Sequence, residues 1–245
     1  MRIYIIGFYT LLISFIGPGC NKNFNCFTDN NEIIITEIPL EIFRNIKITD
    51  IFDTKIVQDS TQKITVEAKK NIADYITVSY TDSVAVISNE NTCNLIGNYD
   101  KRPKLTLHIP DLDSLRVESY NNITTADTFK TDRLVLSFGA QIADCNVTLD
   151  LDKLNIDAEG ETGEFIIKGK ARGFNSYTRN ACKIDARKFE CRWAVTSSFG
   201  INDSQFNAYR LFIVNIYSSG NIQYVNSPEI RLNRLGEGNL EQIEL

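Results

Sequence analysis

The sequence predicts an all-β protein: a single-stranded parallel β-helix, or β-solenoid, of about six coils behind a short β-rich capping unit. Short segments alternate between apolar and polar residues along most of the chain, and the C-terminal half repeats a strand-and-corner pattern about every 20 residues. The composition agrees. The chain has one Met, one Trp and one His but is rich in Asn, Ile, Asp and Thr, which favour strands and turns over helices.

The composition also limits the class of partner. The 245 residues are 43% hydrophobic, which is enough for a packed core, and the absence of low-complexity tracts argues against extensive disorder. The formal net charge is −5, with 26 basic and 31 acidic residues scattered along the chain. Because no basic stripe is present, nucleic acid is not expected as a partner.

Residues 1–19 have the features of a signal peptide. An apolar run from Ile3 to Ile16 is too short to cross a bilayer comfortably but suits the core of a signal. The run ends in "GPGC", which resembles a bacterial lipobox, so Cys20 is expected to become the first mature residue and to carry diacylglycerol. The membrane is then a partner through this anchor, with residues 20–31 as a polar tether. The alternative is an ordinary cleaved signal with Cys20 unmodified.

Residues 32–112 are expected to form the β-rich capping unit. They contain short runs of period two, separated by Asp, Asn, Ser and Thr, which is typical of strands joined by turns. The runs are "EIIITEI", "NIKITDIF", "TKIVQD", "KITVEAK", "YITVSY", "SVAVISN" and "KLTLHIP". The only helical turn expected here lies near residues 69–74.

Residues 113–245 are expected to form the β-helix, because strand starts recur there at a nearly constant spacing. The starts lie at Leu115, Leu134, Leu154, Phe174, Trp193 and Leu211. One such coil cannot cover its own apolar face, but stacked coils form parallel sheets whose inward side chains make continuous columns. Trp193 aligns with Leu154 and Leu211 and is therefore expected in the core.

Several strands lead into a small residue, and these positions are predicted to be corners of the coils. The corner glycines are Gly139, Gly160, Gly200 and Gly220. Gly and Asn are expected at corners because corners need a positive φ, which costs these residues least. Ile201 and Ile222 each follow a corner and are expected to fill a shared inner column.

The sequence predicts no metal and no cofactor. The calcium-binding GGxGxD repeat is absent, as are CxxC motifs and Cys/His clusters, and the leucine-rich-repeat consensus LxxLxLxxN is also missing. Five cysteines follow Cys20, at Cys26, Cys93, Cys145, Cys182 and Cys191. An exported compartment would permit a disulfide, with Cys182 and Cys191 as the candidate pair, whereas buried free thiols are the alternative.

Three stretches of the repeat carry a family resemblance. They are "IDARKFECRWAVTSSFGIND", "LFIVNIYSSGNIQYVNSPEI" and "GEGNLEQI", and they resemble the C-terminal repeats of the head-GIN-domain family of auto-transporter adhesins. Upstream, "FRNIKITDIFDTKIVQ" and "NTCNLIGNYDKRPKLTLHIPDLDSLRVE" look like the start of that family's domain. The resemblance implies a right-handed parallel β-helix in an exported protein, here an outer-membrane lipoprotein that faces the periplasm or the surface.

The sequence departs from the family's pattern at some corners. "SYNN" and "TRNA" lack glycine, and Asn226 stands where the family has Gly. Because Asn tolerates the same backbone region, the fold is still expected to form.

The function expected is a non-enzymatic envelope or surface binding module, adhesin-like, that recognises glycan or protein. Aromatic and arginine residues recur in the repeat, and Tyr177, Arg179 and Tyr217, each near a corner, are the candidate binding surface.

Two other functions stay open at this point, and a serine nucleophile is disfavoured. A β-helix can process glycans with paired carboxylates, for which Asp144 and Asp185 are candidates. A serine nucleophile at Ser197 or Ser218 would need the single histidine, His108, which lies far away in the sequence. The other alternative is a structural spacer or sensor domain tethered to the membrane. No oligomeric state is predicted.

Overall fold

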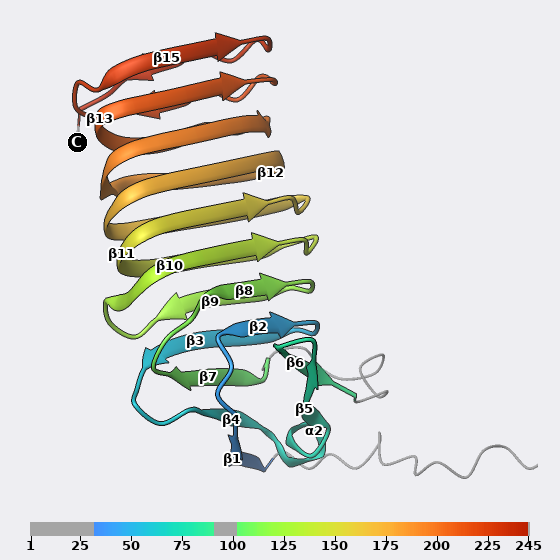
Figure 1. Cartoon of the computed structure of the whole chain (residues 1–245). Coiled ribbons are helices and arrows are strands. Elements are labelled where there is room, and N and C mark those ends of the chain that lie inside the picture. The colour runs from blue at the N-terminus through green and yellow to red at the C-terminus, as the bar shows by residue number, and fades with distance from the viewer. Residues whose placement is uncertain (1–31, 91–101, 245) are drawn as a thin grey trace, which may run out of the picture.

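A computed structural model of the chain describes residues 32–90 and 102–244. Its elements are almost all strands, and parallel strands stack coil upon coil into one elongated β-helix (Figure 1). The predicted all-β, parallel β-helical fold is therefore confirmed. Within the described residues, no helix is long and apolar enough to cross a membrane.

The capping unit and first coil contain β1 (Ile33–Pro39), β2 (Asn45–Ile48), β3 (Phe52–Gln58), β4 (Lys63–Lys69), α2 (Lys70–Ala73), β5 (Ile76–Thr81), β6 (Val84–Asn89) and β7 (Lys104–Ile109). The later coils contain β8 (Ser114–Val117), β9 (Asn121–Thr125), β10 (Phe129–Phe138), β11 (Ala143–Ala158), β12 (Thr162–Gly200), β13 (Ser204–Ile216), β14 (Ile222–Tyr224), β15 (Glu229–Arg234) and β16 (Leu240–Gln242). The short helix α2 lies where the sequence predicts a helical turn.

The stacked strands form two faces. Face A contains β6, β2, β8, the C-terminal parts of β10, β11 and β13, and β15. Face B contains β7, β3, β9, the N-terminal parts of β11 and β13, and then β14 and β16. The long strand β12 continues both faces around more than one coil (Figure 1).

The register shows how regular the stack is. On face A, Leu136 pairs with Ile156 and Ile156 with Ser176, so the coil length is constant there. Later partners, such as Val195 and Ile213, lie slightly closer together in the sequence. The coil becomes shorter through two register shifts in the β12–β13 pairing, one between Asp185 and Glu190 and one between Cys191 and Trp193.

The core follows from strand alternation, because every second side chain points inward and meets its counterpart on the next coil. Among the largest fully buried side chains are Phe138, Phe165, Phe174, Phe189, Phe206 and Phe212. Phe174 contacts Phe189 and Phe206 at ring-centroid distances of 5.4 and 5.8 Å. The burial of apolar surface along these columns is the main stabilising contribution to the stack.

Two inward columns are polar in the middle of the stack. The Ser176 hydroxyl donates to the Thr196 hydroxyl at 2.9 Å, and Thr178 donates to Ser198 at 3.4 Å. All four side chains are buried, so each pair satisfies a hydroxyl that would otherwise be costly inside the core.

The first coil of the stack consists of β2 and β3, which precede most of the cap in the sequence. β2 and β3 pair in parallel with β8 and β9, which come much later in the sequence, as in Ile46 with Leu115. Coil stacking thus starts upstream of residue 113. Between β3 and β8 the chain builds the cap: β7 extends face B, β6 extends face A, and β4, β1 and β5 add antiparallel strands.

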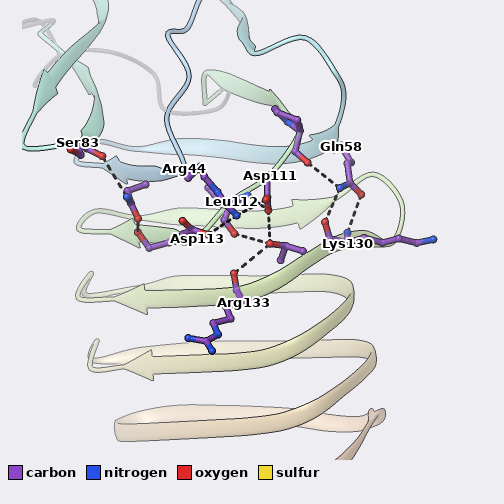
Figure 2. Close-up of polar contacts among 12 residues, drawn as sticks. Arg44, Gln58, Ser83, Asp111, Leu112, Asp113, Lys130 and Arg133 are labelled. Atoms are coloured by element: carbon purple, nitrogen blue, oxygen red, sulfur yellow. Dashed lines mark hydrogen bonds and ion pairs between the residues drawn. The ribbon is translucent and has the colours of Figure 1, made fainter.

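Polar side chains fasten the chain where it returns from the cap to the stack (Figure 2). Arg44 forms ion pairs with Asp111 and with Asp113, the latter at 2.9 Å. The Gln58 amide donates to the carbonyls of Pro110 and Lys130 at 3.1 and 2.7 Å, and its side-chain oxygen accepts from the Lys130 amide at 3.0 Å. These bonds join segments that strand pairing alone does not connect.

The predicted corner glycines end strands at one edge of the stack, but their backbone differs from the expectation. Among the described glycines only Gly169, inside β12, has a positive φ, of 105°. A Cβ on Gly160 would lie 2.1 Å from the Ala140 carbonyl oxygen, and one on Gly220 would lie 2.4 Å from that of Asn202. At Gly160 and Gly220, glycine is therefore required because the preceding coil is too close, and not because of φ.

The asparagine corners do use positive φ. Asn180, in "TRNA", has φ 53°, and Asn226 has φ 67°. The Asn180 side chain also donates to the Gly160 carbonyl on the preceding coil at 2.9 Å. Asparagine thus replaces glycine at these corners without loss of the fold, as predicted.

Two core predictions are wrong. Trp193 is only half-buried and lies on the outer surface, where its ring would be 2.1 Å from a Cβ on Gly173. The buried counterpart of Phe174 is Ala194, one position later, so the regular spacing of strand starts assigned Trp193 to the wrong side of the strand. Ile201 is 59% exposed, and it is the buried Ser204 that pairs with Ile222.

The described cysteines are buried free thiols. Cys182 and Cys191 are not bonded to each other, so the alternative to the disulfide holds. Burial raises the pKa of the Cys182 thiol to about 11 and that of Cys191 to about 12, and it raises the pKa of Cys145 further. These thiols are unreactive packing groups. Cys20, Cys26 and Cys93 lie outside the described residues.

Candidate functional site

The candidate site is an aromatic group at the end of face A, which we call the corner ladder: Tyr177, Arg179, Phe199 and Tyr217. The first three come from β12, and Tyr217 directly follows β13. Ser198 pairs with Ile216, so the next residues, Phe199 and Tyr217, are neighbours on adjacent coils. The three residues predicted from the sequence are therefore brought together, with Phe199 between them.

The contacts within the corner ladder are close. The Phe199 and Tyr217 rings stack with centroids 4.3 Å apart and planes 10° from parallel. Tyr177 lies 5.4 Å from Phe199 on the other side. Arg179 donates a hydrogen bond to the Tyr177 hydroxyl, and its guanidinium lies 5.3 and 5.8 Å from the Tyr177 and Phe199 ring centroids. Such aromatic and cation–π pairs favour one fixed arrangement of the four side chains.

The solenoid repeat explains this geometry. Parallel strands lie about 4.8 Å apart, so outward side chains in register stand at nearly the stacking distance of aromatic rings. The faces of Phe199 and Tyr217 consequently point along the stack, and their edges point to solvent. Phe199 is 40% exposed and Tyr217 36% exposed.

The electrostatics at this corner are unbalanced. Within the described part of the chain, no carboxylate forms an ion pair with Arg179, although most other arginines there have one. Asp157 pairs with Tyr177 along face A, and its pKa is raised by desolvation and then by the nearby Glu159 carboxylate. Arg179 is therefore a cation at this corner without an ion-pair partner among the described residues.

A shallow groove of about 610 Å³ lies on the outer side of face B, around the corner from the ladder. Four of its charged groups form ion pairs: Lys183 pairs with Glu164 at 2.9 Å, and Arg187 with Asp185 at 2.7 Å. The Arg187 hydrogen bonds lower the pKa of the Asp185 carboxyl. The groove is polar and open, with Ile201 at its edge on the corner side.

The carboxylates suggested for glycan hydrolysis have structural partners. Asp144 accepts a hydrogen bond from the Glu164 amide at 3.0 Å, and Asp185 is held by Arg187. A lowered pKa keeps Asp185 ionised, which is the opposite of what a general acid needs.

For a serine nucleophile at Ser197 or Ser218, the histidine that would act as the base lies in the capping unit. His108, in β7, lies 3.3 Å from the Thr65 hydroxyl and 3.4 Å from the Asp59 carboxylate, both in the capping unit. Ser197 instead accepts a hydrogen bond from the Asn215 side chain at 3.3 Å. Among residues 32–90 and 102–244, no group of His, Cys, Asp and Glu side chains could hold a metal ion.

The stacked coils define the class of fold, a parallel β-solenoid. Residues 42–228 match the family described as "Putative auto-transporter adhesin, head GIN domain", and the chain belongs to this family. The family resemblance seen in the sequence is thus confirmed, and the family indicates an exported or surface protein.

Solved structures show the same fold at low sequence identity. A "putative adhesin" from Bacteroides fragilis has a TM-score of 0.78 and 20% identity, covering 86% of this chain and 97% of that one. A "putative lipid binding protein" from Parabacteroides distasonis has a TM-score of 0.64 and 20% identity, covering 88% and 98%. A "putative adhesin" from Parabacteroides merdae has a TM-score of 0.59 and 18% identity, covering 88% and 98%. No curated protein matches significantly.

Phe199 is the member of the corner ladder that sequence reasoning did not select. Its signal was available, because it lies one coil after Arg179 and one coil before Tyr217. Recognising it required the exact phase of each coil, which the register of β12 and β13 provides.

Proposed function

We propose that this protein is a non-enzymatic binding module of the cell envelope, adhesin-like, whose corner ladder contacts a protein ligand. The observation that carries the proposal is the exposed, stacked pair Phe199 and Tyr217, with the half-buried Tyr177 tilted against Phe199, beside an arginine without an ionic partner. Tyr and Arg are the residue types that dominate binding energy at protein interfaces.

The ring orientation favours protein over glycan. A sugar ring packs on an open aromatic face, and both faces of Phe199 are covered, one by Tyr217 and the other by Tyr177 and Arg179. Ring edges carry partial positive charge and, together with Arg179, suit carboxylate or carbonyl oxygens of a polypeptide. A glycan ligand is the competing possibility, and lipid is a further one because one structural neighbour is described as a lipid-binding protein.

The experiment is a pull-down from envelope extracts with the full chain, in parallel with a glycan array and lipid vesicles. Phe199→Ala and Tyr217→Ala should each weaken capture of a protein partner by about 10- to 100-fold. The matched control is Tyr209→Ala, since Tyr209 is 46% exposed but lies outside the ladder. Binding that is equal in all three variants, or seen only with glycans or vesicles, would contradict the proposal.

A glycan-processing enzyme remains the second candidate, because the groove on face B contains the carboxylates Glu164, Asp185 and Asp203. Under the binding proposal, incubation with envelope polysaccharides releases no new reducing ends. Release that is lost in Asp185→Asn would favour the enzyme. If no partner is captured and no polysaccharide is cleaved, the results would favour the tethered spacer.

We also propose that Cys20 carries the lipid that anchors the protein to the outer membrane. The support is the sequence before Cys20 and the exported character of the family. Cys20→Ser should move the protein from the detergent phase to the aqueous phase in Triton X-114 partition. Protease treatment of intact cells then tells surface from periplasmic orientation.

A further inference from the structure

Trp193 lies on the edge of the stack that is opposite the corner glycines, where each coil turns from face B to face A. In Figure 1 this is the edge at which β11, β12 and β13 bend. Trp193 pairs with Leu211 on the next coil, and its ring reaches back over Gly173 on the preceding coil. The single tryptophan of the chain is therefore an outer residue, and core packing does not explain it.

The indole ring lies flat on the coil beneath it. A Cβ on Gly173 would be 2.1 Å from Cζ2 of Trp193 and 2.5 Å from each of two ring atoms bonded to it, Cε2 and Cη2. A point beyond the edge of the ring would be much farther from those two atoms than from Cζ2, so one face of the indole covers the glycine. Glycine is needed at position 173 because the ring takes the place of a side chain. The other face of the ring points away from the stack.

This outer face is not covered in the way that the faces of Phe199 are. In the part of the chain that the structure describes, no aromatic ring contacts Trp193, and Lys153 is the cation nearest its ring, at 5.9 Å from the centroid. The C–H groups of a sugar ring carry partial positive charge and pack on the negative face of an aromatic ring. An open indole face is therefore a platform for a sugar.

Cations lie on both sides of this platform. Toward the N-terminal end of the stack, Lys153 pairs with Gly173, and Arg133 pairs with Lys153 on the coil before it. Toward the C-terminal end, the register shift between Cys191 and Trp193 places Arg210 near the exposed Arg192. We call Trp193 and these four cations the basic edge. Within residues 32–90 and 102–244, none of the four forms an ion pair.

The carboxylates on the same edge do not balance these cations. Asp152 is already paired with Arg172, at 2.8 Å. From Lys130 to Arg210, the exposed carboxylates without an ion pair are Asp132 and Glu190, and they are outnumbered by the unpaired cations of the basic edge. These cations are scattered along the sequence, and the turn of each coil brings them to one edge.

We infer that the basic edge binds an acidic polysaccharide, with one sugar ring on the outer face of Trp193 and acidic groups on the cations on either side. A linear ligand laid along the stack meets a new coil about every 4.8 Å, so it contacts several cations at once. Charge complementarity favours an acidic over a neutral glycan. This surface lies on the opposite edge from the corner ladder, and the inference does not depend on the protein ligand proposed there.

The test is binding of the full chain, in detergent, to polygalacturonate and to dextran sulfate by biolayer interferometry. Neutral dextran and an oligothymidylate are the comparison ligands. The wild type should bind at least one of the acidic polysaccharides, and the stronger of the two tells a carboxylate from a sulfate ligand. Neither binding, dextran binding equally well, or binding of the oligothymidylate alone would overturn the inference.

Two variants test the platform. Trp193→Ala should weaken binding about 10- to 100-fold, because the stacking surface is removed. Gly173→Ala should have a similar effect, because it keeps the indole but displaces it from the coil. The matched control is Tyr217→Ala, which removes an exposed aromatic ring on the opposite edge and should leave polysaccharide binding unchanged. A loss in Tyr217→Ala without a loss in Trp193→Ala would place the glycan at the corner ladder and contradict the inference.

Charge reversal tests the cations. Lys153→Glu and Arg192→Glu should each weaken binding about tenfold, and added salt should reduce the difference. The matched control is Lys55→Glu, since Lys55 is an exposed lysine of β3, on face B, without an ion pair among the described residues. Equal losses in all three variants would show a response to net charge alone and overturn the inference. Circular dichroism of every variant shows whether the fold is intact.

Discussion

The coil stack and the capping unit consist of the same kind of strand but are held together in different ways. In the stack, each strand pairs with the sequence one coil away, as in Asn121 with Ala143 and Ile213 with Arg231. In the capping unit, parallel partners lie several coil lengths apart in the sequence, and the β4–β7 and β5–β6 pairs are antiparallel. Repetition gives the stack its register, whereas the cap needs specific polar side chains such as Arg44.

The comparison can first be tested at the centre of the stack. Phe174→Ala should lower the free energy of unfolding by about 3–5 kcal/mol, because it removes a fully buried ring from a column that continues through several coils. Phe199→Ala, on the outer surface of the same strand, should cost less than about 1 kcal/mol. Urea unfolding followed by circular dichroism measures both. Similar values would mean that the columns do not carry the stability.

The spacing between coils is tested at the corners. Gly160→Ala should cost about 2–4 kcal/mol, because its Cβ would lie 2.1 Å from a backbone oxygen that cannot move aside. Gly139→Ala should change stability by less than about 0.5 kcal/mol, since no atom lies within 4 Å of the added Cβ. Thermal unfolding of the two variants gives the difference. An equal effect would show that backbone freedom, and not coil spacing, selects glycine.

The role of polar fastening is tested at the junction. Gln58→Ala should cost about 1–3 kcal/mol, because the carbonyls of Pro110 and Lys130 and the Lys130 amide lose their partner. Gln205→Ala in the stack removes one side-chain bond, to Gln223 at 2.7 Å, and should cost less than about 0.5 kcal/mol. Hydrogen exchange should show the Gln58 loss first in β7 and β4. If the stack were affected equally, cap and stack would unfold as one unit.

The smallest effect concerns pH. Hydrogen bonds from Arg187 lower the pKa of Asp185 below its ordinary value of about 3.9, so its contribution to stability is present above that pH. The contribution is lost as the pH falls through the lowered pKa. Asp185→Asn should therefore destabilise by less than about 1 kcal/mol at pH 7 and have no effect in strong acid. A difference that persists in acid would assign the loss to packing and not to charge.

Much of the fold could be predicted because, in a solenoid, the repeat length in the sequence indicates which strands pair. Leu134 and Leu154 are buried and pair on adjacent coils as expected, whereas Leu115, also buried, pairs with Leu136, two positions after the expected partner. The corner asparagines Asn180 and Asn226 were also predictable from residue chemistry. In the candidate site, Tyr177, Arg179 and Tyr217 could be selected from the sequence because each lies near a predicted corner.

The remainder could not be predicted because a strand has a period of two, so an error of one position moves a side chain to the opposite side. Trp193 is one position short of a full coil from Phe174, because the coil there has 20 residues, as in the Ser176–Thr196 contact. Trp193 therefore lies outside over Gly173, and Ile201 lies at the corner and not in a column.

The sequence by itself determined the class of fold, the coil period and the residue types at the corners, because these depend on local conformational preference and on spacing along the chain. Only the tertiary structure decided that Phe199 lies between the predicted binding residues and that the strands of the first coil precede the cap in the sequence. These features depend on which coil stacks on which. That order is set by packing between segments distant in the sequence, such as those that pair Asn45 with Ser114.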